Sequence, residues 1–294
     1  PGAGIPSSFD SSVTWIEWYP GGWQVLFPSG GGPCDYKGVE LSYHGEASAM
    51  FWDVIQLDQN EDAATVQLRT RLARSPFTVT REIVLPADSN AFLLRETIQN
   101  DGREPMEYMW GHHPAYGAPF LSGDCRIDTN ARTIVADDAY DPPASVMDVG
   151  GTFSWPTVSR DGQTTDLIRV PGDDEPRASL GYFDGYDEIA WYGITNPSLG
   201  IGAGMAWRRD DFPHAWFWQE LHASPGFPWY KGVYVTAIEP NTTYPGQGLI
   251  AAREKTGTQR ELGPGESRTA EIRAVLYESA SGIGGIGMGG KVQT

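Results

Sequence analysis

Residues 64–72, Ala-Thr-Val-Gln-Leu-Arg-Thr-Arg-Leu, place apolar and polar side chains in alternation, with Thr70 as the one polar residue in the apolar series. Successive side chains of a β-strand point to opposite faces of its sheet, so this period of two predicts a strand with one buried face and one solvated face. The same alternation recurs at residues 92–98 and 270–276. The sequence therefore predicts a protein built from antiparallel sheets.

The rest of the chain supports an all-β fold in a single domain. Its 36 glycines and 22 prolines are spread between short alternating runs, and no segment shows convincing helical periodicity. We expect one β-sandwich domain over residues 1–278, in which the polar stretch 132–177 forms loops and short strands. Residues 279–294 are rich in glycine and of low complexity, and we expect them to form a flexible tail.

Composition excludes several classes of function. The formal net charge is -17 and no run of Lys or Arg occurs, which argues against nucleic-acid or anionic-membrane binding. A phosphorylated substrate is disfavoured for the same reason, although one local Arg pair could still hold it. No apolar run approaches the length of a membrane span. Aromatic residues make up 12% of the chain, which suits a carbohydrate site but also suits a β-sheet core.

The two cysteines, Cys34 and Cys125, lack the spacing of a metal site. We interpret them as reduced thiols of a cytoplasmic protein, with a single disulfide between them as the alternative. No cofactor and no metal are expected, and the protein is expected to be a monomer or a homodimer.

Two distant segments carry candidate acid–base residues. His112 and His113 lie side by side in the aromatic segment 110–117, and Glu239 ends the apolar run 233–238. Neighbouring strand residues face opposite ways, so only one of the two histidines can reach a substrate. Burial of Glu239 would raise the pKa of its carboxyl group and make it a stronger base. A histidine and a carboxylate that meet in the fold could exchange protons with a neutral substrate.

These segments resemble the aldose 1-epimerases (galactose mutarotases), with an early His-Gly at 44–45, a His-Pro at 113–114 and a late Glu-Pro at 239–240, in the family's order. The resemblance implies a large antiparallel β-sandwich, or supersandwich, that binds a monosaccharide in an open cleft. It implies that His113 protonates the sugar ring oxygen while Glu239 takes the proton of the anomeric hydroxyl. It assigns His44 to a sugar hydroxyl and leaves His112 at the rim of the site.

The chain departs from the family at the arginine that commonly precedes the His-Gly motif, because no Arg occurs before Arg69. Arg81 is a candidate replacement, since it interrupts an apolar strand face. Asp187 is the candidate for the family's substrate-binding aspartate, although a turn-capping role is the alternative. Gln219 and Trp229, which precede the late glutamate, are further candidates for contact with the sugar. A non-catalytic carbohydrate-binding protein on the same scaffold is the alternative function.

Overall fold

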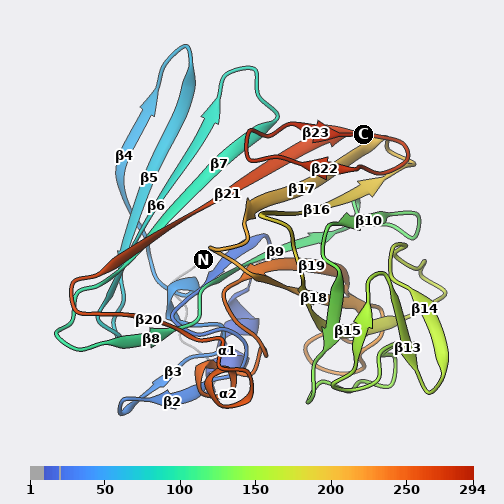
Figure 1. Ribbon diagram of the computed structural model, residues 1–294, viewed down its shortest axis with the longest axis horizontal. Helices are drawn as coiled ribbons and strands as arrows, with labels where there is room; N and C mark the ends of the chain where they lie inside the picture. The colour runs from blue at the N-terminus through green and yellow to red at the C-terminus, as the bar shows by residue number, and fades with distance from the viewer. Residues whose placement is uncertain (1–9, 20) are drawn as a thin grey trace.

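The computed structural model describes residues 10–19 and 21–294, and its regular structure is almost entirely β (Figure 1). Two large sheets dominate it, and every strand pairing within them is antiparallel. The predicted all-β, antiparallel sandwich is therefore confirmed. The three alternating segments of the sequence lie in three strands of one sheet: β5 (Ala63–Arg71), β7 (Ala91–Asn100) and β21 (Ser267–Glu278).

The first sheet has seven strands and carries the candidate catalytic residues. Its strand order is β1 (Trp23–Leu26), β9 (Gly111–Gly117), β19 (Tyr234–Asn241), β18 (His214–Leu221), β15 (Arg177–Asp184), β11 (Thr133–Ala136) and β12 (Thr152–Ser154). The central strands β15, β18 and β19 are buried along most of their length, so they read as nearly continuous apolar runs.

The second sheet has eight strands. Its strand order is β10 (Arg126–Thr129), β16 (Ile189–Asn196), β17 (Ile201–Arg208), β21, β7, β6 (Phe77–Pro86), β5 and β4 (Asp53–Gln59). Strands β4 to β6 extend beyond the first sheet, which Figure 1 shows at the upper left, and every residue of β4 is exposed. The core fills the space between the two sheets with large side chains such as Trp110, Tyr192, Trp207 and Phe217.

The remaining elements are short. Four two-stranded ribbons pair β2 (Cys34–Tyr36) with β3 (Val39–Leu41), β8 (Met106–Tyr108) with β20 (Arg260–Leu262), β13 (Thr157–Arg160) with β14 (Gln163–Asp166), and β22 (Gly285–Ile286) with β23 (Val292–Gln293). The helices are α1 (Ser11–Trp18), α2 (Leu249–Lys255) and the 3-10 turn η1 (Glu46–Ser48). The sequence did not predict α1, although Asp10 caps it by accepting hydrogen bonds from the N–H groups of Ser12 and Val13.

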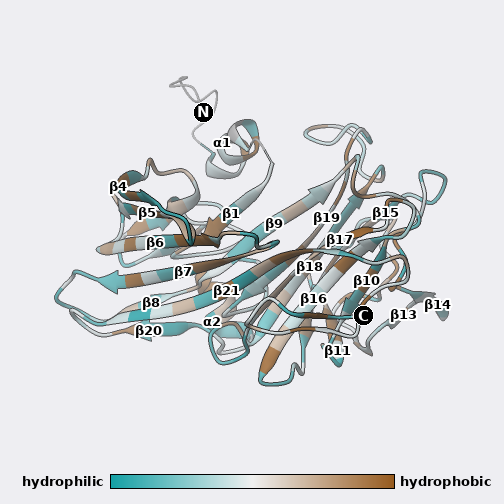
Figure 2. Cartoon of the chain, turned by 90° about the horizontal axis from the view of Figure 1, so that it is seen from above, coloured by the Kyte–Doolittle hydropathy of each residue, from teal (hydrophilic) through white to brown (hydrophobic). Residues whose placement is uncertain are grey.

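The glycine-rich segment 279–294 differs from the expected flexible tail, because it forms the β22–β23 hairpin against the eight-stranded sheet (Figure 2). Ile283 and Ile286 are buried against Tyr277 and Ala206. The Ile283 N–H also donates to the Asp128 carboxylate at 3.0 Å. The apolar side chains set between the glycines hold the segment in place, and the composition alone concealed them.

Both cysteines are free thiols, with Cys125 buried and Cys34 partly buried, so the single-disulfide alternative is not observed. Among residues 10–19 and 21–294, no helix has the length and apolar character needed to cross a membrane.

Candidate active site

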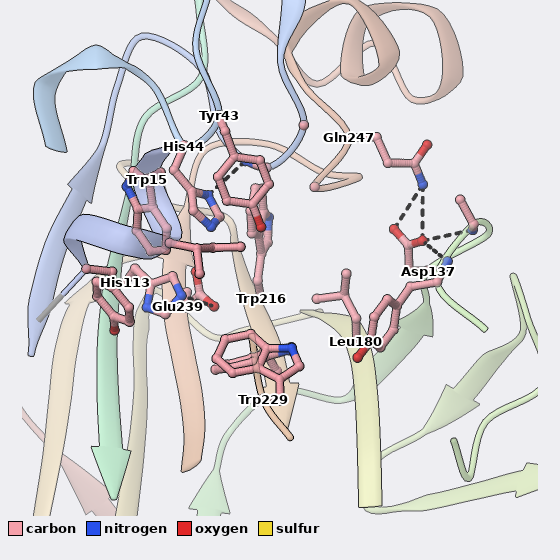
Figure 3. Close-up of a pocket in the computed structure, with 18 residues that line it drawn as sticks. Trp15, Tyr43, His44, His113, Asp137, Leu180, Trp216, Trp229, Glu239 and Gln247 are labelled. Carbon is pink, nitrogen blue, oxygen red and sulfur yellow. Dashed lines mark hydrogen bonds and ion pairs between the residues drawn. The ribbon is translucent and has the colours of Figure 1, made fainter. Parts of the chain in front are cut away.

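A cleft of about 490 Å³, whose lining residues Figure 3 shows, lies on the seven-stranded sheet. It opens on the face that points away from the eight-stranded sheet. The alternation of side chains along β9 shows which face of the sheet carries the cleft. The Tyr116 hydroxyl meets the Tyr192 hydroxyl of β16 at 2.8 Å between the sheets, whereas His113, an odd number of residues away, lines the cleft. The cleft therefore takes its floor from one sheet and its walls from the loops and from α1.

His113 and Glu239 face each other on adjacent strands. Ala237 pairs with Ala115 and Asn241 pairs with Gly111, which places Glu239 directly opposite His113. Their side chains meet in the cleft, with His113 Nε2 3.7 Å from Glu239 Oε1. His113 Nδ1 and Glu239 Oε2 are buried and have no hydrogen-bond partner among the described residues. Two proton-exchanging groups are thus close together, each with an atom that a ligand could engage.

Burial controls the charge of this pair. Desolvation raises the pKa of the Glu239 carboxyl well above its ordinary value, and desolvation lowers the pKa of His113 to about 4. Burial thus favours the neutral form of both groups, a protonated carboxyl beside an uncharged imidazole. The sequence predicted the raised pKa of Glu239 but not the lowered pKa of its partner, because the depth at which His113 is buried depends on the surrounding loops.

His44 stands beside this pair, with its ring centroid 5.5 Å from that of His113. The Gly31 N–H donates to His44 Nδ1 at 3.1 Å, so the neutral ring carries its hydrogen on Nε2. Gly45 sets the position of the turn: its φ is 74°, and a Cβ there would lie 2.4 Å from the Phe27 carbonyl oxygen. His44 lines the cleft and has an Nε2–H that can donate, and its contact with a sugar hydroxyl stays a prediction.

Aromatic side chains form much of the cleft lining. Helix α1 contributes Trp15, whose ring stacks at 4.5 Å on that of Tyr19, the residue that follows the helix. The Trp15 indole donates to Ser48 Oγ at 3.0 Å. On the opposite side Trp218 of β18 lies 5.6 Å from Trp229, which the loop between β18 and β19 carries. Trp229 lies in the cleft where the sequence predicted a sugar contact, whereas the contribution of α1 was missed.

Asp137 lines the cleft at the end away from His113, and sequence reasoning missed it (Figure 3). Its Oδ1 accepts from the N–H groups of Ala139 and Tyr140 at 2.8 and 2.7 Å, and its Oδ2 accepts from the Tyr182 hydroxyl and from Gln247 Nε2. These bonds organise the loop that carries Tyr140. The only sequence signal was its position directly after the short strand 133–136.

His112 and Arg81 do not lie in the cleft, contrary to expectation. Both point between the sheets toward Glu96, which is fully buried. Arg81 Nη2 lies 2.6 Å from Glu96 Oε2, and His112 Nε2 lies 3.9 Å from Glu96 Oε1. The arginine that interrupts an apolar face is thus neutralised by a buried carboxylate on the neighbouring strand β7, and cannot replace the family's sugar-binding arginine.

Gln219 and Asp187 are also absent from the cleft. Gln219 is fully buried on the other face of β18 from Trp218, where neither amide atom has a partner among the described residues. Asp187 is exposed and pairs with Arg132 at the protein surface. Gln219 misses the cleft because neighbouring residues of a strand face opposite sides of the sheet. Asp187 misses it because its ion pair with Arg132 lies at the protein surface.

Within the described part of the chain, no group of three or more His, Cys, Asp or Glu side chains is arranged to hold a metal ion.

Stability should fall as the solution is acidified from about pH 6.5 toward pH 4. Burial lowers the pKa values of His44, His112 and His113 in the folded state, so the unfolded chain binds more protons in this window. The raised pKa of Glu239 changes stability in the opposite direction and offsets the contribution of one of the three histidines. The net slope should approach roughly 3 kcal/mol per pH unit. Urea unfolding at several pH values measures it, and a flat profile would contradict neutral, buried histidines.

Comparison with sequence families gives one match over most of the chain. Residues 6–275 match the model of a family described as a domain of unknown function, DUF4432. No curated protein matches the chain.

Solved structures resemble it more widely. A Klebsiella pneumoniae protein named provisionally as an aldose 1-epimerase is 17% identical with a TM-score of 0.63, and the match covers 91% of this chain but only 66% of that protein. An Escherichia coli protein named in the same way is 18% identical with a TM-score of 0.61, covering 87% of this chain and 84% of that one. A galactose mutarotase-like protein from Lactobacillus casei is 20% identical with a TM-score of 0.60, covering 87% and 85%. The fold is therefore the galactose mutarotase-like β-sandwich.

Proposed function

We propose that this chain, which belongs to the DUF4432 family, is an aldose 1-epimerase-like isomerase that interconverts the α and β anomers of a monosaccharide. The observation that carries the proposal is the 3.7 Å approach of His113 Nε2 to Glu239 Oε1 on the floor of an aromatic cleft. The fold of the solved relatives supports it. Acceleration of anomer exchange for a neutral aldose by the purified protein tests it.

The reaction needs one base and one acid. Glu239, as carboxylate, takes the proton of the anomeric hydroxyl while His113 gives a proton to the ring oxygen. The bond between C1 and the ring oxygen breaks, and C1 becomes a carbonyl carbon. Rotation about C1–C2 presents the other carbonyl face, and the ring hydroxyl adds to it as both protons return. Each positioned proton transfer is worth about 10²–10⁴-fold, so two suffice for a reaction that already proceeds in water.

The proton count of the pair fits this scheme. A protonated Glu239 beside a neutral His113 holds the same single proton as a carboxylate beside an imidazolium. Burial favours the neutral arrangement in the empty cleft. The neutral arrangement serves ring closure, in which His113 takes the proton of the hydroxyl that attacks C1 and the Glu239 carboxyl gives its proton to the carbonyl oxygen. Ring opening uses the carboxylate beside the imidazolium, so a reversible interconversion passes through both arrangements in turn.

The rate should follow a bell-shaped pH profile whose acidic limb lies near pH 4. Below that pH His113 is protonated as well, so the pair holds two protons and neither group can act as a base. Above the raised pKa of Glu239 the pair loses its one proton and no acid remains. Measurement of kcat/KM for anomer exchange between pH 3.5 and 10 checks this. An acidic limb near pH 6.5, the ordinary pKa of histidine, would show that His113 is not buried as described.

The cleft lining favours an uncharged sugar, and the free cysteines favour a reducing compartment. Its described lining contains two acidic residues, Asp137 and Glu239, and no Lys or Arg. Together with the net charge of -17, this disfavours phosphates and carboxylates. The two free thiols suit the cytoplasm.

A non-catalytic carbohydrate-binding protein is the second candidate. It is favoured by the lack of Lys and Arg in the described cleft lining, because aldose 1-epimerases commonly use an arginine to hold the sugar. The two candidates separate cleanly, because a binding protein would bind the sugar without raising its rate of anomer exchange.

A further inference from the structure

The cleft is longer than one sugar ring along the direction that crosses the strands. Glu239 lies on β19, and Asp137 directly follows β11, three strands away through β18 and β15. Neighbouring strands lie about 4.8 Å apart, so the two ends of the floor are about 14 Å apart. The outermost ring hydroxyl oxygens of a pyranose are only about 6 Å apart, given single bonds of about 1.5 Å. Figure 3 shows Glu239 and His113 on one side of the cleft and Asp137 and Gln247 on the other.

The volume of the cleft leads to the same conclusion. A hexose has twelve heavy atoms and occupies roughly 200 Å³, or about seven water molecules at ~30 Å³ each. The cleft encloses about 490 Å³, which is room for two such rings. A monosaccharide held by His113 and Glu239 would leave the far end of the cleft to solvent.

The far end presents surface for stacking and few free polar atoms. Leu180 of β15 pairs with Trp218 of β18 and lies beside it on the floor. Tyr140 is held at this end by its backbone N–H, which donates to Asp137 Oδ1 at 2.7 Å. Gln247 is engaged at both ends of its amide, since its Nε2 donates to Asp137 and its Oε1 accepts from Lys255. Such a surface suits the C–H face of a neutral ring.

The extra room does not suit a phosphate. Lys255 contacts the lining residue Gln247 from outside the cleft, but its Nζ is also held by both Asp138 carboxylate oxygens at 2.7 Å. Asp137 also contributes negative charge to this end. A phosphoryl or carboxylate substituent would meet carboxylates and filled hydrogen bonds.

We infer that the cleft has a second subsite at Leu180 and Tyr140, beyond the Trp218–Trp229 pair, whose Trp218 ring lies 6.0 Å from that of His113. It binds the non-reducing ring of a neutral disaccharide whose reducing ring lies on His113 and Glu239. The inference rests on the proposed function and extends it from a monosaccharide to the reducing end of a short oligosaccharide. Because the far end offers stacking and few free hydrogen-bonding groups, it should accept more than one linkage.

Polarimetric mutarotation kinetics with glucose, maltose and cellobiose test the inference. We expect kcat/KM for at least one disaccharide to exceed that for glucose by about tenfold or more, because a stacked ring adds binding energy that glucose lacks. Leu180→Trp should fill the far end and lower the disaccharide-to-glucose ratio at least about tenfold. Leu199→Trp, at an exposed leucine outside the cleft, is the matched control and should keep the wild-type ratio. Trp229→Ala gives a second test if Leu180→Trp does not fold.

Binding to the Glu239→Gln variant, measured calorimetrically, separates this inference from the proposed function. Tighter binding of disaccharide than of glucose would support the second subsite even if no sugar is epimerised. Catalysis of glucose exchange with no preference for either disaccharide would overturn the second subsite and leave the isomerase intact. A preference for glucose 6-phosphate over both disaccharides would also overturn it.

Discussion

Replacing Glu239 by glutamine should lower catalysed anomer exchange by about 10²-fold or more, because the substitution removes one of the two groups that exchange protons with the sugar. Glutamine keeps the shape of the side chain, so sugar binding should be retained. Burial raises the pKa of the Glu239 carboxyl well above its ordinary value, so at pH 7 this group opposes folding. The variant should therefore be at least as stable as the wild type at pH 7.

Exchange kinetics, sugar binding and thermal unfolding of the same preparation check this prediction. Glu271→Gln is a matched control, since Glu271 pairs with Arg95 on the solvated face of the other sheet, far from the cleft in the strand order. A Glu239→Gln variant that keeps more than about a tenth of the wild-type rate would remove Glu239 from the mechanism.

The adjacent histidines should respond in different ways to alanine substitution. His113→Ala should lose about 10²-fold or more in rate, because His113 is the partner that faces Glu239 across the cleft. His112→Ala should keep its rate within a few-fold but lose about 2–4 kcal/mol of stability. That loss is expected because the His112 ring is fully buried, accepts a hydrogen bond from the Trp23 indole at 3.1 Å and packs against Phe212.

Rate measurements on folded protein, together with urea unfolding, distinguish the two effects. If His112→Ala were the inactive variant and His113→Ala the destabilised one, the strand register of β9 would be wrong by one residue.

The fold was predictable because strands of a sheet with one solvated face alternate apolar and polar side chains. The pattern at residues 64–72 predicts β5, whose polar residues Gln67 and Arg69 lie on the solvated face opposite Glu82 and Thr80 of β6. Helix α1 was not predictable in the same way, because eight residues are too few to establish a helical period and its Asp10 cap is a weak signal. The tail was misjudged because glycine content concealed the burial of Ile283 and Ile286.

The candidate site was predictable where a residue's face follows from parity along one strand. His113 and Glu239 both end on the cleft face, and Trp229 follows from the loop that joins β18 to β19. The prediction that Gln219 contacts the sugar was wrong, because neighbouring residues of β18 face opposite sides of the sheet. Trp218 lines the cleft, and Gln219 therefore points into the core.

Residues whose surroundings come from distant segments could not be placed from the sequence. His112 turns toward Glu96 of β7, a buried carboxylate whose pKa is held below its usual range by Arg81, its cross-strand partner in the β6–β7 hairpin, against the opposing effect of burial. Asp137 enters the cleft because β11 lies next to β15, a neighbour relationship that no local pattern encodes. The partner of a buried charge is set by strand order, and strand order is a property of the whole chain.

The most direct test of the acid–base pair is magnetisation transfer between the two anomeric protons of a reducing sugar, measured by NMR with and without the protein. Maltose and glucose should both be used, so that the result does not depend on the second subsite. The account predicts exchange that rises in proportion to protein concentration and that collapses to the rate in buffer with Glu239→Gln. Saturable sugar binding with exchange no faster than in buffer would contradict it, and would identify the chain as a carbohydrate-binding protein.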